Sequence, residues 1–327
     1  MNKTDTKKLA VVIPNWNGVE LLPSCLAAVQ RQTLKPARVI VVDNGSEDES
    51  VELLAREYPW VEVITLEKNY GFAGGVNRGI EAARTADIDA IALLNTDAEP
   101  EPQWLEGLWR RMQADESLAA AAAKQLDYTG CIDSAGEELS IWGVPFSRGR
   151  GETDQGQYEE PTDIFAATGG ASLYRVQALR TVGLLDERFF AYFEDVDWCF
   201  RARLQEWNVA YEPTAVVHHQ VGATSDRLGG FRLYHMYKNF WLLNMKNLPA
   251  GLLLKYGWRI LGVFVVKLAK LLISLRLWTL VKVIAVSAYY TPGLLLTRWQ
   301  LQRSRQVKPN EIDKLLYHGR PPRADGS

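Results

Sequence analysis

Short apolar runs alternate with helical patterns through the N-terminal part of this 327-residue chain. The runs cover residues 9–13, 39–42, 61–66 and 90–94, and most are rich in β-branched side chains. Apolar strands that alternate with helices favour a parallel sheet built by right-handed crossovers. We therefore predict an α/β fold with a mostly parallel central sheet flanked by helices.

Polar residues stand where three of these strands end. Asn15 and Asp43 close the first two strands, and Asn95, Thr96 and Asp97 follow the fourth. Ligands of open α/β sheets bind beyond the carboxyl ends of the strands, so we expect these side chains to share one site. A Pro-Asn-Trp-Asn-Gly segment follows the first strand in place of the glycine fingerprint of dinucleotide-binding folds. This argues against a nicotinamide or flavin enzyme.

Residues 69–79 are glycine-rich and open a helix that we predict over residues 74–84. The backbone of such a helix start can approach a nucleotide or diphosphate closely, with Arg78 as a counter-charge. The alternative is a tight turn whose glycines only satisfy a positive φ. The motif alone does not decide between the two.

Two segments carry candidate metal ligands. Asn95, Thr96 and Asp97 could offer oxygen ligands to a divalent ion, or form a turn capped by Asn and Asp. A predicted strand over residues 209–217 ends at His218 and His219. These histidines could bind a metal or phosphate, or be structural. A position near Asp97 would favour the metal.

Three carboxylates, Glu194, Asp195 and Asp197, follow a run of aromatic residues and begin a helix predicted over residues 194–206. Helix N-termini stabilise negative charge. Apolar rings disfavour the charged form of a carboxylate and raise its pKa toward the range of a general base. The alternative is an acidic first turn with an ion pair to Arg201 or Arg203.

The charges are distributed unevenly along the chain. The formal net charge is −2, yet residues 227–310 contain no Asp or Glu against fourteen Lys and Arg. Residues 251–300 are apolar, with cations on a rough helical stripe. The longest uncharged run, residues 283–297, contains Pro292 and Gly293, where we expect a break. It falls short of the eighteen or so apolar residues of a spanning helix.

An interfacial pair of amphipathic helices on an anionic membrane surface fits this pattern. A re-entrant hairpin and a spanning pair with snorkelling lysines are alternatives, as is a helical domain packed on the catalytic domain or on a second subunit. Nucleic acid is not expected as a partner, because the stretch is too apolar and its cations are not clustered. We expect a domain over residues 1–226, a membrane-associating region over 227–310 and a polar tail over 311–327.

Three cysteines without metal-like spacing fit a reducing compartment. The polar N-terminus runs straight into the first strand and lacks the longer apolar core of a secretory signal. We therefore expect the protein at the cytoplasmic face of the plasma membrane, as a peripheral or monotopic protein. Residues 125–163 are expected to form hairpins and loops, and residues 165–174 a strand.

The ordered motifs resemble the inverting glycosyltransferases of family 2, which have the GT-A fold. The nearest resemblance is to bacterial rhamnosyltransferases of cell-surface polysaccharide synthesis. Matching segments are residues 12–18, 42–46, 69–79, 94–97, 170–174, 183–203 and 218–219, in family order. The ordered set is far more specific than any one motif.

The resemblance implies a donor site for a nucleotide diphosphate sugar. Asp43 would hydrogen-bond a pyrimidine base, and Pro14 and Asn15 would line the same site. The residues along the nucleoside and diphosphate would be Asn69, Gly74, Gly75, Arg78, Asn95 and Thr96.

It also implies a divalent metal, Mg²⁺ or Mn²⁺. The Asn95-Thr96-Asp97 segment takes the place of the family's metal-binding Asp-X-Asp, with Asp97 as a ligand. His219, or His218 beside it, would complete the site. Asn95 departs from the family pattern because it offers a neutral oxygen, which lowers the expected metal affinity.

In the family's reaction, Asp195 would be the catalytic base. It would deprotonate an acceptor hydroxyl that attacks the anomeric carbon, and the nucleotide diphosphate would leave with inversion. Glu194 and Asp197 would position the acceptor or pair with Arg201.

We therefore expect a glycosyltransferase that uses deoxythymidine-diphosphate-rhamnose (dTDP-rhamnose) and a polysaccharide or polyprenyl-linked glycan acceptor. A uridine-diphosphate sugar is the alternative donor. A sugar nucleotidylyltransferase is disfavoured, because no Gly-rich segment with Arg and Lys follows the first strand. A catalytically silent glycan-binding or scaffold protein of this fold is disfavoured by the acidic pair and the two histidines.

Overall fold

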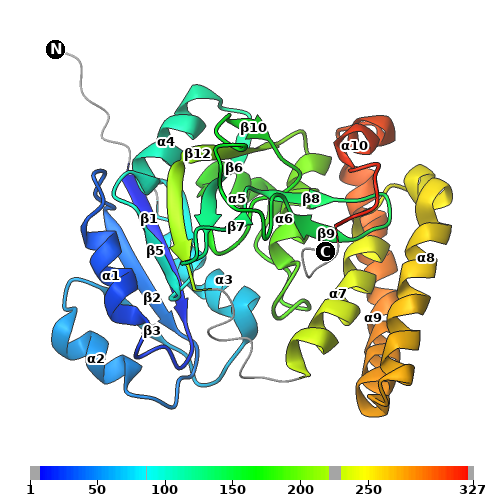
Figure 1. Cartoon of the computed structure of the whole chain (residues 1–327), viewed down its shortest axis with the longest axis horizontal. Helices are drawn as coiled ribbons and strands as arrows, with labels where there is room; N and C mark the ends of the chain where they lie inside the picture. The colour runs from blue at the N-terminus through cyan, green and yellow to red at the C-terminus, as the bar shows by residue number, and fades with distance from the viewer. Residues whose placement is uncertain (1–7, 86, 221–229, 323–327) are drawn as a thin grey trace.

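The computed structural model describes residues 8–85, 87–220 and 230–322. The expected boundary between residues 226 and 227 lies outside these ranges, as do the last five residues of the polar tail. A ten-stranded sheet forms the centre of the described chain (Figure 1). Its main path runs in the order β10-β12-β6-β11-β4-β1-β2-β3, with β5 paired to β12 and β7 paired to β6.

The strands of this sheet, in chain order, are β1 (Lys8–Asn15), β2 (Arg38–Asp43), β3 (Glu62–Thr65), β4 (Ile88–Leu94), β5 (Ala98–Pro100), β6 (Leu118–Leu126), β7 (Ile132–Ser134), β10 (Thr162–Asp163), β11 (Ala171–Arg175) and β12 (Asn208–His219). A separate antiparallel hairpin consists of β8 (Glu137–Leu139) and β9 (Pro145–Ser147). The strands β3, β2, β1 and β4 are parallel, β11 is antiparallel to both its neighbours, and β12 is parallel to β6. The predicted α/β sheet is confirmed.

The predicted strand over residues 165–174 is shorter than expected, because β11 begins only at Ala171. The backbone before it turns away from the sheet, and the N–H of Gly169 donates to a side chain of a helix instead of to a neighbouring strand. A local apolar pattern cannot distinguish a backbone N–H that bonds a neighbouring strand from one that bonds a side chain.

Helices cover both faces of the sheet. Because side chains alternate along a strand, Val11 and Ile13 of β1 face one helical layer while Ala10 and Val12 face the other. The first layer consists of α1 (Leu22–Gln30), α2 (Ser50–Glu57) and α4 (Trp104–Ala114). The second layer begins with α3 (Gly71–Ala83), α5 (Val176–Val182) and α6 (Glu194–Leu204).

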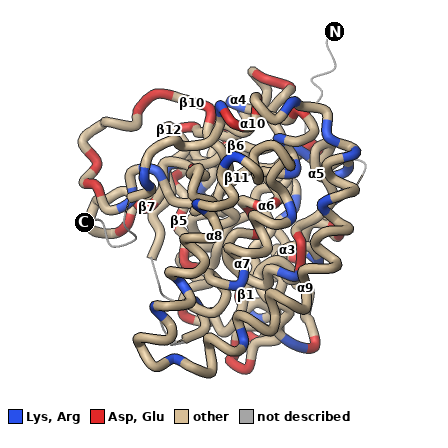
Figure 2. The backbone as a smooth tube through the Cα atoms, turned by 90° about the vertical axis from the view of Figure 1, so that its right-hand side faces the viewer, with Lys and Arg blue, Asp and Glu red and all other residues tan. Residues whose placement is uncertain are grey.

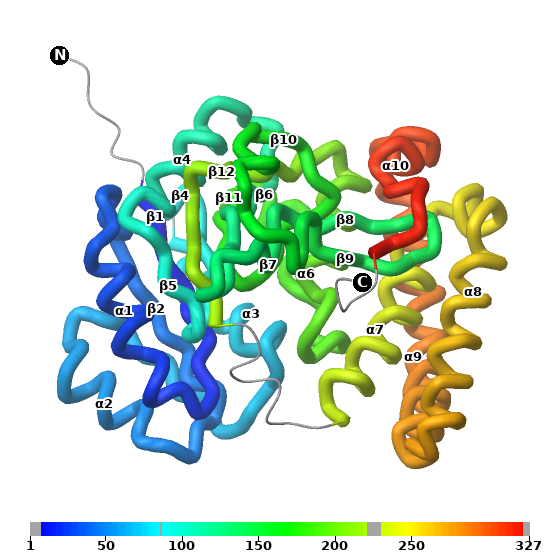
Figure 3. The backbone as a smooth tube through the Cα atoms, viewed as in Figure 1, coloured from blue at the N-terminus to red at the C-terminus, as the bar shows by residue number. Residues whose placement is uncertain are grey.

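Four further helices follow: α7 (Phe231–Asn247), α8 (Ala250–Ile273), α9 (Leu277–Ser304) and α10 (Pro309–Leu315). Of these, α7 packs against α6 and α9, while α8 and α9 form an antiparallel hairpin at the right of Figure 1. The chain then returns to the β8–β9 hairpin (Figure 3), where the N–H of Tyr317 donates to the carbonyl of Leu139 at 2.9 Å.

The break expected at Pro292 and Gly293 is wrong, because α9 continues through both residues. Proline removes one helical hydrogen bond, but its fixed φ is compatible with a helix. In the residue directly before the proline, the hydroxyl of Thr291 donates to the carbonyl of Ser287 at 2.7 Å. Among the described residues, α9 is the one helix whose length and composition would allow it to cross a membrane.

Candidate active site

The carboxyl ends of β1 and β2 lie side by side, and their polar residues contact each other. Pro14 pairs in register with Val42, and Asn15 with Asp43. The buried Asn15 amide donates to Asp43 Oδ2 at 3.0 Å, and the N–H of Ser46 donates to Asp43 Oδ1 at 3.1 Å. Both oxygens of Asp43 are therefore fixed at the sheet edge.

The glycine-rich segment lies tightly against the end of β2. Asn69 Oδ1 accepts a hydrogen bond from the N–H of Gly71 at 2.7 Å and another from the Asn44 amide at 3.2 Å. A Cβ at Gly75 would stand 3.2 Å from the Asn44 amide nitrogen, and one at Gly74 would stand 2.6 Å from Tyr70 Cβ. These glycines allow an approach that a side chain would obstruct.

Arg78, the expected counter-charge, is paired with Glu187 and lies 5.0 Å from the centre of the Tyr70 ring. Its side chain is about one-third exposed. The guanidinium therefore stands at the glycine-rich segment, already bound to a protein carboxylate.

The loop after β4 meets the end of β12. His219 Nε2 lies 3.2 Å from Asp97 Oδ1, and His219 Nδ1 lies 2.9 Å from Asp133 Oδ2. Burial lowers the pKa of His219, but its hydrogen bonds to Asp133 and Asp97 outweigh burial and raise the pKa to about 9. Without a metal, the imidazole is thus a cation held between two carboxylates.

His218 points to the other side of β12, as successive side chains of a strand do. Its Nε2 lies 3.1 Å from Glu101 Oε1, and its ring stacks with Tyr128. Of the two candidate histidines, His219 is the one that the structure places in contact with Asp97.

The described residues contain no group of three or more His, Cys, Asp and Glu arranged to hold a metal. The side chains of Asp97 and His219 are nevertheless close enough to contact one ion. Asn95 Oδ1 beside them is buried and has no hydrogen-bond partner within the described ranges. Since Mg²⁺ is usually held by one or two carboxylates together with substrate phosphates, this set of residues fits such an ion.

Asp195 is the second residue of α6 and is partly exposed. Its Oδ2 accepts the N–H of Gly169 at 2.8 Å, and its Oδ1 accepts the N–H of Val196 at 2.7 Å. Burial raises the pKa of Asp195, and these N–H groups offset part of the rise. The carbonyl of Gly170 accepts the N–H of Asn95 at 2.9 Å, so adjacent glycines contact Asp195 and the loop of Asp97.

The neighbouring carboxylates are buried more deeply. Burial and the charge of Asp195 raise the pKa of Glu194 well above its ordinary value. Asp197 is fully buried and contacts Arg201 Nε at 3.0 Å, Lys246 Nζ at 2.8 Å and the Asn247 amide at 2.8 Å. Pairing with Arg201, one of the alternatives for Asp197, is what the structure shows.

The segment before α6, residues 189–193, is called here the aromatic loop. Phe190, Tyr192 and Phe193 have φ values of 66°, 71° and 70°. Such left-handed conformations cost roughly 1–2 kcal/mol for each non-glycine residue. The loop also contacts the glycine-rich segment, because a Cβ at Gly71 would stand only 2.5 Å from Phe190 Cγ. It therefore brings Asp195 next to the expected donor site.

Sequence reasoning missed several residues of this site. Asp133 comes from the region expected to be loops, and Gly169 contributes a backbone group that no motif reveals. Helix α7 also contributes polar side chains, and these belong to a Lys-Asn pair that occurs twice, eight residues apart, at positions 238–239 and 246–247. Eight residues are close to two helical turns, so this repeat was the available signal.

Comparison with known proteins identifies the family of this chain. The model of glycosyl transferase family 2 matches residues 10–183, more than half of the chain. The chain belongs to glycosyl transferase family 2. An N-acetylglucosaminyl-diphospho-decaprenol L-rhamnosyltransferase of Mycobacterium tuberculosis is 26% identical over 240 residues, which cover 67% of this chain and 78% of that protein. The O-antigen chain rhamnosyltransferase RfbN of Salmonella typhimurium is 35% identical over 91 residues, 28% of each chain.

Solved structures agree on the fold. This family 2 glycosyltransferase superposes on the crystal structure of GalNAc-T7 with UDP, GalNAc and Mn²⁺ with a TM-score of 0.58 and 17% identity, covering 75% of this chain and 48% of that one. The TarS structure of S. aureus gives a TM-score of 0.51 at 16% identity, with 40% of its chain covered. The expected family, enzyme class and GT-A-like fold are confirmed.

The contacts of Asp197 predict a large difference between two lysines of the C-terminal helices. Lys246 is buried between Asp186 and Asp197, whereas Lys255 is half exposed beside Asp313. We expect Lys246→Met to lower the free energy of unfolding by about 3–5 kcal/mol, because it removes the buried cation that Asp186 and Asp197 share and leaves each with a single arginine. Lys255→Met should cost less than about 1 kcal/mol. Urea denaturation followed by circular dichroism measures both, and equal losses would contradict the assigned network.

Proposed function

We propose that this glycosyltransferase moves a sugar, with inversion, from a nucleoside diphosphate donor onto a polysaccharide or polyprenyl-linked glycan of the cell envelope. dTDP-rhamnose is the proposed donor. The observation that carries the proposal is the position of Asp195, a partly exposed carboxylate fixed by two backbone N–H groups beside the glycine-rich segment. Two rhamnosyltransferases among the relatives support the sugar, and the decaprenol-linked substrate named for one of them supports the acceptor.

On the donor side, Asp43 would accept a hydrogen bond from the ring N–H of a pyrimidine, between Pro14 and Asn15. A carboxylate can accept more hydrogen bonds than the two that Asp43 already makes. Thymine and uracil share that N–H, so a uridine-diphosphate sugar is the alternative donor. The diphosphate would lie at the start of α3, along the residues Asn69, Gly74, Gly75 and Arg78, and would reach Asn95 and Thr96.

On the acceptor side, Asp195 would take the proton of a sugar hydroxyl. The hydroxyl oxygen then forms a bond to the anomeric carbon on one face while the bond to the diphosphate oxygen breaks on the other, which inverts the centre. A raised pKa makes Asp195 a stronger base. Glu194, whose pKa burial raises further, would stay protonated, because its own burial and the adjacent charge of Asp195 both disfavour a second negative charge.

For a divalent ion, Mg²⁺ or Mn²⁺, we propose Asp97 and His219 as the protein ligands. His218 faces the other side of β12 and is the weaker candidate. When bound, the ion would neutralise charge on the leaving diphosphate. To bind the ion through Nε2, His219 would have to release the proton that this nitrogen directs at Asp97, while Nδ1 would keep its proton toward Asp133.

We also propose that the α8–α9 hairpin binds the anionic surface of the membrane from the cytoplasmic side, within a region spanning residues 227–310. Large apolar side chains are exposed along α8 at a helical spacing, namely Leu254, Trp258, Leu261 and Val265, and along α9 at Leu277, Trp278, Val281 and Ile284. In Figure 2 both helices carry cations and no acids. A surface that is apolar, basic and free of acids suits anionic lipid.

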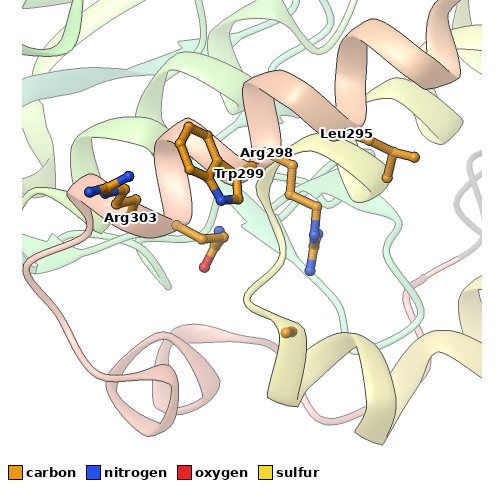
Figure 4. Close-up of a pocket in the computed structure, with 6 residues that line it drawn as sticks. Leu295, Arg298, Trp299 and Arg303 are labelled. Atoms are coloured by element: carbon orange, nitrogen blue, oxygen red, sulfur yellow. The ribbon is translucent and has the colours of Figure 1, made fainter.

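A hollow of about 560 Å³ lies at the open end of this hairpin, lined by Ala250 and by residues of α9. Figure 4 shows Arg298, Trp299 and Arg303 along it. Arginine and tryptophan both favour the interface between lipid headgroups and acyl chains, which supports placing this end at the membrane surface.

If Asp195 is the base, its loss should change the rate of sugar transfer but not the affinity for the donor nucleotide. Asp195→Asn should keep the affinity for the donor nucleotide and lower the transfer rate about 100-fold or more, since general bases contribute at least that much. Calorimetry with dTDP and UDP, and a transfer assay with a polyprenyl-linked glycan, measure the two. Asp163→Asn, an exposed carboxylate on β10, is the control and should keep full activity. An active Asp195→Asn variant would remove Asp195 as the base.

A thermal-shift panel tests the donor and the metal. The full chain is measured with dTDP, UDP, GDP and CDP, each with and without Mn²⁺ or Mg²⁺. A ligand that binds the folded state raises its stability. We expect a shift with a pyrimidine diphosphate that grows with metal, and loss of the metal-dependent part in Asp97→Asn. If no nucleotide shifts the transition in detergent or lipid, the silent scaffold becomes the better interpretation.

The hairpin predicts binding to vesicles that contain anionic lipid. Trp258→Glu should weaken co-sedimentation with phosphatidylglycerol vesicles about tenfold or more, because it removes a large apolar side chain and adds a negative charge. Trp60→Glu changes an exposed tryptophan between α2 and β3, outside the hairpin, and should have no effect. Absence of vesicle binding together with a concentration-dependent dimer in sedimentation velocity would assign the hairpin to subunit contact.

A further inference from the structure

The backbone carbonyls of the aromatic loop and of the residue before it are held from two sides. The ammonium group of Lys238 donates to the carbonyls of Arg188 at 2.8 Å and Phe189 at 3.2 Å. The carbonyl of Phe190 accepts the N–H of Ala73 in α3 at 3.1 Å. Thus α7 and the start of α3 together hold the loop that leads into α6.

Asn239 of α7 holds the same loop with a single amide group. Its Nδ2 donates to the carbonyls of Phe189, Ala191 and Tyr192 at 3.0, 2.8 and 2.7 Å. Asn239 is fully buried. Three carbonyl oxygens converge at this point, so a donor is required there and the opposite orientation of the amide would be repulsive.

These contacts act on a backbone that would otherwise relax. Tyr192 and Phe193 are both left-handed, and Phe193 directly precedes α6. A residue in this conformation persists only where its surroundings determine it. A change in the backbone conformation of the aromatic loop would therefore rotate the first turn of α6, where Asp195 accepts a hydrogen bond from the N–H of Gly169.

We propose that Asn239, assisted by Lys238, is a positioning residue for sugar transfer: it holds the aromatic loop in its strained form and so fixes the carboxylate of Asp195 against Gly169. The proposal rests on the proposed role of Asp195 as the base. It gives α7 a part in the reaction through Asn239, a residue that is fully buried.

The test compares Asn239 with Asn244 of the same helix. Asn244 is equally buried, and its amide donates to the carbonyls of Gly143 at 2.9 Å and Phe240 at 2.8 Å, away from the aromatic loop. The variants are Asn239→Ala, Asn239→Asp, Asn244→Ala and Asn244→Asp in the full chain. Asparagine and aspartate have the same shape, but an ionised carboxylate cannot donate to a carbonyl.

For each folded variant, kcat, KM, the pH profile and calorimetric binding of dTDP and UDP are measured. We expect the Asn239 variants to lower kcat about tenfold to 100-fold, the range for a reacting group displaced by about an ångström. Nucleotide affinity should not change. In Asn239→Ala the acidic limb of kcat/KM should move to higher pH, because Asp195 would lose an N–H partner that lowers its pKa.

A purely structural role would give a different pattern. If Asn239 and Asn244 variants lose activity equally, or if Asn239→Ala keeps its kcat and its acidic limb, the proposal is overturned. Lys238→Met covers the case in which the Asn239 variants do not fold, because it removes the ammonium group that donates to carbonyls of the same segment. An unchanged kcat in Lys238→Met would count against the proposal. An inactive Asp195→Asn beside fully active Asn239 variants refutes the positioning role alone, whereas an active Asp195→Asn refutes the base assignment itself.

Discussion

The buried carboxylate of Asp197 is the constraint on which the arrangement of the second helical layer depends. A charge with no exposure to water is tolerated only with close partners. Arg201 supplies one from the same helix, and Lys246 and Asn247 supply two more from α7. Because these partners come from helices on both sides of residues 221–229, α6 and α7 are bound together at a fixed register. The α8–α9 hairpin then packs onto α7.

The candidate site therefore has two halves of different origin. Regular strand ends supply Asn15, Asp43 and the loop of Asp97, and their positions follow from sheet geometry. The half that contains Asp195 is built by a strained loop between α3 and α7. Under the proposed function, the first half would hold the donor and the second half would face the acceptor.

Much of the first half could be predicted from the sequence, because strand periodicity and chain order place Asn15, Asp43 and Asp97 at one edge. In the second half, Asp195 and its helix could be predicted, but the contacts that fix them could not. Asp133 contacts His219, and Gly169 contacts Asp195; these contacts join residues far apart in the chain and leave no local pattern. The apolar and basic pattern of residues 227–310 grouped Lys246 with surface cations, although it is buried against Asp197. At Pro292, tertiary context overrode a local helix-breaking preference.

The contacts of Asp197 with Lys246 and Asn247 limit how this chain can be truncated or joined to part of a relative. A chain cut near residue 226 would keep every motif of the sheet edge and yet leave Asp197 in the core with Arg201 as its cation. A hybrid that joins this sheet to the C-terminal helices of a relative would need a lysine and an asparagine at matching positions of the incoming helix. A substitution of Asp197 would thus call for a matching change at Lys246 or Asn247, so the C-terminal helices and the candidate site can be altered only as a pair.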